Sequence, residues 1–224
     1  MDQAANYEIT LTKRMHLEKE YYAFDFTKPE GFVFTEGQFG LFGIVGREIE
    51  GKKLRAFSIA SENGEPFIRV ATRIVAVPSD FKCRLLELNP GDKVTMKAPL
   101  GEFVLDASRP AVFIAGGIGI TPIRSMLLAK ARNAGVGHDV LIYSELEANY
   151  PFHSELESLA GLEILYAADI EPTQKAILQT IDKRQNDAGY YLSGSPGFIR
   201  SITALLEAHG IQPDRIRFDV FVGY

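Results

Sequence analysis

Two short stretches of the sequence combine residue types that bind phosphate groups. In the first, a short apolar run is followed by three glycines and by two residues typical of a helix start: Gly116, Gly117 and Gly119, then Thr121 and Pro122. Glycine adopts positive φ without cost and allows close approach to the backbone, while threonine and proline favour the N-cap and the first helical position. The N-terminus of such a helix favours a bound phosphate. A tight strand-to-helix turn is the alternative, because the spacing is not that of the G-x-G-x-x-G fingerprint.

The second stretch is Arg55-Ala56-Phe57-Ser58, at the end of an expected strand and just before Ser61. It offers a phosphate-binding guanidinium, a flat aromatic face and a hydroxyl within four residues. Because side chains alternate along a strand, Arg55 and Phe57 should share one face and Ser58 should point to the other. Taken singly, they would be an edge arginine, a core phenylalanine and a turn serine. Their combination favours a binding site.

The elements that carry the second stretch are mostly β-strands. Short runs rich in aromatic and β-branched residues, separated by turn residues, predict strands at 7–13, 20–26, 39–45, 53–59, 66–72 and 93–97. One helix interrupts them, with Ser79 as its predicted cap and Asn89-Pro90-Gly91 as its end. Several short strands with a single helix indicate a small antiparallel β-barrel.

After the polar segment 106–110 the pattern changes to alternating strands and helices. Strands are predicted at 111–115, 139–143, 162–166, 189–193 and 215–221, and helices at 122–134, 153–160, 173–185 and 196–209. This alternation indicates an α/β domain with a five-stranded parallel sheet, which binds ligands where the strand order switches. We therefore expect a barrel domain at 1–107 and a nucleotide-binding domain at 108–224.

The composition excludes several classes of protein. A net charge of −5 argues against a nucleic-acid partner, and no apolar run approaches the ~20 residues that span a bilayer. The first residues lack the features of a secretory signal. Cys83 is the only cysteine, and the four histidines lack metal-ligand spacing. We expect a cytoplasmic protein with no metal site.

The segment RAFSIAS resembles the R-x-Y-S-x-x-S flavin motif of the ferredoxin–NADP⁺ reductase superfamily. In that family the arginine holds the flavin phosphate, the aromatic residue packs on the isoalloxazine, and the serine hydroxyl lies near flavin N5. Phe57 replaces the usual tyrosine, which keeps the stacking surface and removes a hydrogen bond. The helix predicted to start at Ser79 also resembles the family. The resemblance implies a flavin site made of Arg55, Phe57, Ser58, Ser61, Thr72, Ser79, Phe81 and Lys82.

The segment G-G-x-G-x-T-P resembles the nicotinamide-binding segment of the same superfamily. Ser193-Gly194-Ser195-Pro196-Gly197 stands where the family commonly has C-G-P-x-x-M, so Ser193 replaces the cysteine that approaches the nicotinamide. The same residues also predict a helix start, with Ser195 as cap and Pro196 as first residue. The resemblance implies a nucleotide site made of Gly116, Gly117, Gly119, Thr121, Pro122, Glu145, Ser193, Gly194 and Pro196.

The loop after the strand 139–143 bears on the choice of nucleotide. An acid at the end of the second strand binds the ribose 2′-hydroxyl in doubly wound folds, whereas an arginine accepts a 2′-phosphate. Glu145 and Glu147 occupy this loop, which has no arginine or lysine before Pro151. We therefore expect NADH to be preferred over NADPH. The alternative is that a basic residue from elsewhere, such as Arg124, meets the phosphate.

Family members often end on an aromatic residue that covers the flavin, with an acidic residue two positions before it. Asp219 and Phe221 match that pair, and Tyr224 is the competing candidate. A core position in a terminal strand is the alternative for Phe221.

The resemblance implies a flavin-dependent reductase that transfers a hydride from NAD(P)H to flavin N5. The reduced flavin would then pass single electrons to an acceptor such as ferredoxin or flavodoxin. Ser58 and Asp219 are candidates for proton handling. FAD is favoured over FMN, because Arg55 and the helix start at Ser79 offer two phosphate positions. A reductase component of a multi-component oxygenase and a non-catalytic nucleotide-binding module are the alternatives.

Overall fold

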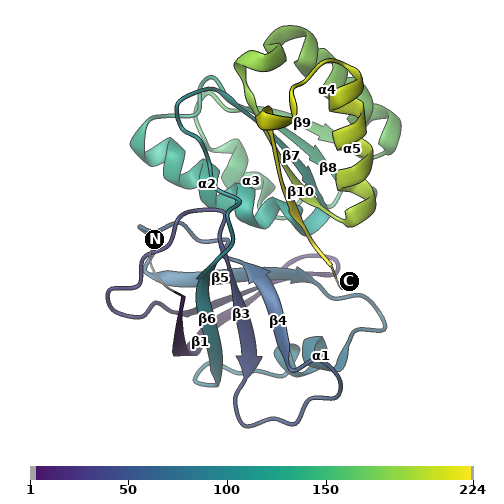
Figure 1. The fold of residues 1–224 in the computed structure, drawn as a ribbon. Helices are drawn as coiled ribbons and strands as arrows, with labels where there is room; N and C mark the ends of the chain where they lie inside the picture. The colour runs from purple at the N-terminus through teal and green to yellow at the C-terminus, as the bar shows by residue number, and fades with distance from the viewer. Residues whose placement is uncertain (1–3, 223–224) are drawn as a thin grey trace. The chain divides into compact units, whose positions relative to one another are not determined.

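The computed structural model describes residues 4–222 and divides the chain into two compact units, Met1–Val104 and Leu105–Tyr224 (Figure 1). Among the described residues, none of the helices is long and apolar enough to cross a bilayer. Residues 4–222 also contain no group of three or more His, Cys, Asp or Glu side chains placed to hold a metal ion.

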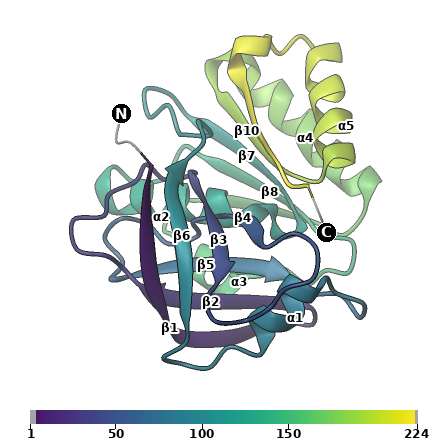
Figure 2. The ribbon, with the colours of Figure 1, turned by 60° about the horizontal axis from the view of Figure 1, so that its bottom comes forward.

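The first unit is a six-stranded sheet in which every paired neighbour is antiparallel (Figure 2). The strand order is β4-β3-β6-β1-β2-β5, and the Ala60 amide donates to the Arg69 carbonyl at 2.8 Å, which brings the two outer strands together. This arrangement confirms the predicted barrel. Its strands are β1 Ala5–Glu18, β2 Tyr21–Thr27, β3 Phe39–Ile44, β4 Leu54–Ser58, β5 Phe67–Arg73 and β6 Lys93–Leu100.

One helix, α1 (Asp80–Leu86), packs on the barrel core through Phe81 and Leu85. It begins one residue after Ser79, as the sequence predicts. The Ser79 side chain, however, makes no capping hydrogen bond, so the predicted cap is wrong in its chemistry. With only two turns, this helix has little stability of its own and owes its position to its contacts.

The second unit is a five-stranded parallel sheet in the order β11-β10-β7-β8-β9. Helices α2 and α3 lie on one face of the sheet and α4 and α5 on the other (Figure 1). The strand order switches between β7 and β10: β8 and β9 follow β7 on one side of it, and β10 and β11 lie on its other side. The bounds are β7 Ala111–Gly116, α2 Ile120–Asn133, β8 Val140–Ser144, α3 His153–Glu157, β9 Glu163–Ala167, α4 Ile170–Arg184, β10 Gly189–Gly194, α5 Pro196–Ala208 and β11 Ile216–Val220.

The start of α2 differs from the prediction. A 3₁₀ turn, Gly117–Gly119, follows β7 directly, and α2 begins at Ile120. The Thr121 hydroxyl donates to the Ile118 carbonyl at 3.0 Å, so it does not cap, and Pro122 is the third helical residue. The physical reason is that Gly117, with a φ of 53° that glycine adopts without cost, turns the chain after β7, and Gly119 is already helical in conformation with φ of −58°.

The start of α5 is as predicted. The Ser195 side chain accepts a hydrogen bond from the Phe198 amide at 3.3 Å, and Pro196 is the first helical residue. A serine cap followed by proline is a signal read from neighbouring residues alone, which explains why the sequence was sufficient here.

Candidate functional site

Three cationic side chains gather at the edge of the barrel beside α1. Lys82 on α1 is 8% exposed, and its ammonium donates to the Arg73 carbonyl at 2.6 Å. Burial, followed by the charges of Arg55 and Arg73, lowers the pKa of Lys82 to about 8. The lowered pKa shows that the charged form of Lys82 is destabilised by burial and by the two arginines. An anion bound beside these three side chains would offset their repulsion, so the arrangement favours binding of an anionic ligand.

Arg55 is the member of this group whose guanidinium hydrogen bonds go to main-chain carbonyls. Its guanidinium donates to the main-chain carbonyls of Lys52 and Leu54 at 2.9 and 3.3 Å, and its Cζ lies 5.5 Å from the centre of the Phe81 ring. Within the described part of the chain no carboxylate pairs with it. Donors that are not already matched by a carboxylate are suited to a phosphate.

Arg73, at the end of β5, is the site residue that sequence reasoning missed. It forms an ion pair with Glu20 at 2.8 Å and lies close enough to Lys82 to lower its pKa. Arg73 belongs to no motif with Arg55, because only the closing of the sheet brings β4 and β5 together. We call Arg55, Arg73 and Lys82 the cation cluster.

Phe57 shares a face with Arg55, as the alternation predicts, but its ring lies mostly in the core. It is 9% exposed and lies between Phe42 and Phe81, with ring centres 5.7 and 6.1 Å away. Phenylalanine has no hydroxyl that needs a polar partner, so its ring packs inward where a tyrosine would have to reach one. Little of the ring is left as a stacking surface.

The hydroxyl residues around the cluster are also buried. Ser61 accepts a hydrogen bond from the Arg69 amide at 3.0 Å, and the Thr72 hydroxyl donates to the Arg73 carbonyl at 3.4 Å. Ser58 is buried at the end of β4. Ser61 thus helps to join β4 to β5, which places it in the support of the site.

At the switch point of the second unit, the glycines allow strands and helices to approach closely. A Cβ on Gly119 would lie 2.2 Å from the Ser193 carbonyl oxygen, and one on Gly116 or Gly194 would lie about 3 Å from the Phe198 ring. Phe198 thus packs over both strand ends. The glycine requirement follows from this packing before any ligand is considered.

Ser193 lies at the carboxyl end of β10 beside these glycines. It is fully buried, and its hydroxyl has no hydrogen-bond partner among the described residues. Asp219 is its register partner on β11, and the Phe221 amide donates to the Gly194 carbonyl at 2.8 Å. The predicted pair, Asp219 and Phe221, therefore lies beside the carboxyl end of β10. Tyr224, the competing candidate, lies outside the described residues.

Glu145 follows β8 at the same edge of the sheet. Its side chain is buried, and it raises the pKa of Tyr150, an effect second to the burial of that phenol. The loop that continues from it holds two residues with positive φ, Ala148 at 54° and Phe152 at 66°. Strained backbone of this kind concentrates at functional loops.

Arg124 does not fill the role suggested for it. Its side chain is fully buried, and both Nε and Nη2 donate to the Glu155 carboxylate at 2.7 Å. The guanidinium also lies 5.1 Å from the centre of the Phe152 ring. It therefore fixes the loop between β8 and α3, and the suggestion that it meets a 2′-phosphate is wrong.

Comparison with known proteins gives relatives over nearly the whole chain, although no family model matches. The chain is 27% identical over 234 residues to a flavohemoprotein of Bacillus subtilis (strain 168), covering 94% of this chain and 58% of that protein. It is 25% identical to the toluate 1,2-dioxygenase electron transfer component of Pseudomonas putida, covering 98% of this chain and 68% of that protein. The ferredoxin reductase in carbazole 1,9a-dioxygenase has a similar structure, with a TM-score of 0.81 over 97% of this chain and 70% of that one at 18% identity.

Proposed function

We propose that this chain, which belongs to the ferredoxin–NADP⁺ reductase superfamily by its fold and its relatives, is a flavin-dependent NAD(P)H oxidoreductase. Bound flavin would accept a hydride from the nicotinamide and release electrons singly, and the protein would bind and orient both nucleotides. The observation that carries the proposal is the cation cluster, in which Lys82 stays buried beside Arg55 and Arg73.

The flavin is proposed to be FAD, held in the first unit. The cation cluster would bind its phosphates, with Arg55 as the main donor because Arg73 is already paired with Glu20. Ser58 would lie near the reactive part of the ring and take part in proton handling. Phe57 would contact the flavin only through the exposed edge of its ring, because the rest of the ring is buried.

The nicotinamide nucleotide is proposed to bind at the switch point of the second unit. The turn from Gly116 to Gly119 would take its diphosphate. Ser193, whose buried hydroxyl has no hydrogen-bond partner in the described part of the chain, would face the nicotinamide end. Glu145 would bind the ribose and favour NADH. Asp219 is proposed to handle a proton and Phe221 to shield the reacting rings.

The acceptor is proposed to be a separate redox protein, either a ferredoxin or flavodoxin or an oxygenase component. The oxygenase alternative has its own support, because one relative is named as the electron transfer component of toluate 1,2-dioxygenase. The chain spans 58% of the length of the flavohemoprotein it matches, so the proposal concerns electron delivery alone.

The purified protein, supplied with FAD, should become yellow and lose that colour under NADH in the absence of oxygen. Added ferricyanide should restore the colour and support continuous oxidation of NADH. Absorbance at the flavin and NADH bands measures both steps. A protein that takes up neither FAD nor FMN contradicts the proposed function, whereas one that takes up FMN alone corrects only the choice of flavin.

The affinity for FAD should fall as the pH rises above 8. Lys82 has a pKa of about 8 in the free protein, and a bound phosphate would raise it by favouring the charged ammonium. Binding then takes up a proton above pH 8, so the affinity should fall by up to about tenfold per pH unit there. Titrations between pH 6.5 and 9.5 measure this, and Lys82→Met should bind more weakly without the same pH dependence. An unchanged pH profile in that variant would show that another group titrates.

A further inference from the structure

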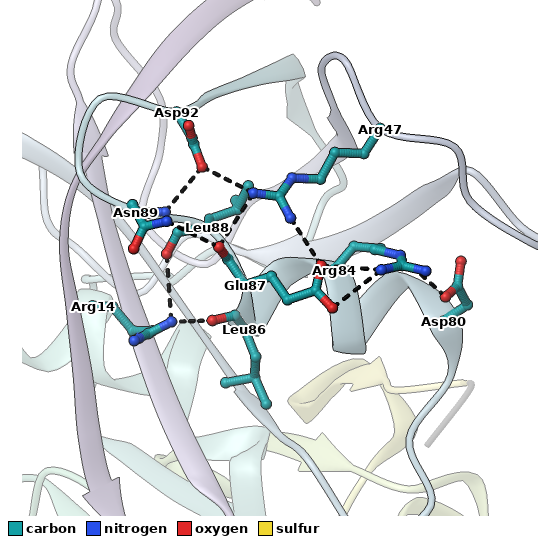
Figure 3. Close-up of polar contacts among 9 residues, drawn as sticks. All are labelled: Arg14, Arg47, Asp80, Arg84, Leu86, Glu87, Leu88, Asn89 and Asp92. Atoms are coloured by element: carbon teal, nitrogen blue, oxygen red, sulfur yellow. Dashed lines mark hydrogen bonds and ion pairs between the residues drawn. The ribbon is translucent and has the colours of Figure 1, made fainter.

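Two arginines from outside α1 hold its carboxyl end (Figure 3). Arg14 on β1 donates to the carbonyls of Leu86 and Leu88, and Arg47, between β3 and β4, donates to the Glu87 carbonyl at 3.2 Å. The last carbonyls of a helix have no partners within it, and cations there complement its negative end. These guanidinium groups therefore tie a short helix to the barrel.

Arg47 makes the wider set of contacts. Its two terminal nitrogens also reach the carboxylates of Glu87 at 2.9 Å and Asp92 at 3.1 Å, and its side chain is 27% exposed. From the same loop, the Glu50 amide donates to the Asp80 carboxylate at 2.8 Å. The loop before β4 thus holds both ends of α1.

The same loop and the same helix carry members of the cation cluster. The loop leads directly into β4 and Arg55, whereas α1 carries Phe81 and Lys82. We infer that Arg47 is a positioning residue that sets α1 against β4, so that Arg55 and Lys82 can bind one flavin phosphate group together. The inference rests on the proposed function for the identity of the ligand.

Arg84 provides a matched control on the same helix. It pairs with Asp80 at 3.4 Å and with Glu87 at 3.1 Å, and all three residues belong to α1 or its last turn. Like Arg47, Arg84 carries one positive charge and contacts Glu87. Its removal, however, leaves the hydrogen bonds from the loop before β4 to α1 in place. Exposed pairs of this kind contribute little stability.

The test measures the binding of three ligands that differ in their number of phosphate groups: riboflavin with none, FMN with one and FAD with two. Each is titrated into Arg47→Ala and into Arg84→Ala. Arg47→Ala should bind FMN and FAD about tenfold more weakly, because α1 would no longer hold Lys82 in place for a charge-assisted contact with the phosphate, while riboflavin changes less than twofold. Arg84→Ala should stay within twofold for all three. Arg47→Lys should recover only part of the loss, because one ammonium cannot replace the guanidinium fork.

Amide hydrogen exchange of residues 80–87 gives a second readout that needs no flavin. Exchange should be faster in Arg47→Ala than in Arg84→Ala. If Arg47→Ala does not fold, the same measurements are made on Arg47→Lys. Equal loss of riboflavin and FMN binding, or unchanged FMN binding with unchanged exchange, overturns the positioning role. Wild-type protein that binds FMN no better than riboflavin instead overturns the phosphate role of the cation cluster, and so identifies a failure of the proposed function.

Discussion

Replacing Arg55 with alanine is expected to give a folded protein that binds FAD about 10- to 150-fold more weakly. A hydrogen bond to a charged group contributes about 1.5–3 kcal/mol, and each 1.4 kcal/mol corresponds to a tenfold change in affinity. The fold should survive, because among residues 4–222 the hydrogen bonds of the guanidinium go to the carbonyls of Lys52 and Leu54, and its ring contact is with Phe81. Its loss leaves no buried carboxylate without a partner.

Fluorescence titration of FAD measures the effect, and the absence of tryptophan from the chain simplifies the signal. Lys53→Ala is the matched control, since it removes one positive charge from an exposed side chain two residues away. A similar loss in both variants would point to general attraction of an anion and would contradict a specific contact by Arg55. The Lys82 titration should also move to higher pH in Arg55→Ala, because Arg55 is one of the charges that lower that pKa.

The sequence predicted the fold well wherever the signal was local or periodic. The alternation of apolar runs with helical patterns after residue 106 predicts the parallel sheet, and the Ser195-Pro196 pair predicts the start of α5. The sharing of one face by Arg55 and Phe57 follows from the period of a strand. Such signals need no knowledge of distant contacts.

The prediction failed where distant segments decide the outcome. Arg73 joins the cation cluster only because the sheet closes, and Arg124 is unavailable only because Glu155 reaches it from α3. The sequence predicts Phe57 as a stacking surface, but its contacts with Phe42 and Phe81 leave little of the ring exposed. The start of α2 differs from the prediction because the glycines that allow a tight turn also form a 3₁₀ turn, Gly117–Gly119, that leads directly into the helix.

The burial of Glu145 makes its charge more consequential than the sequence alone suggests. It lies at the carboxyl end of β8, next to the central strand β7, and its charge already reaches the Tyr150 phenol. Burial lowers the local dielectric, so a second negative charge nearby is penalised more than it would be in water. Glu147, two residues later, is exposed and has no such environment.

Wild-type protein is therefore expected to prefer NADH to NADPH, and Glu145→Gln should lose much of that preference. A carboxylate ~5 Å from a 2′-phosphate costs roughly 1–3 kcal/mol, or about five- to two-hundredfold in kcat/KM. Glutamine keeps the size of the buried side chain, so the comparison isolates its charge, and Glu147→Gln should change the ratio less than twofold. The pKa of Tyr150 should fall in Glu145→Gln, which checks the placement of the charge without any nucleotide. A tenfold preference of the wild type for NADPH at fixed ionic strength would refute this assignment.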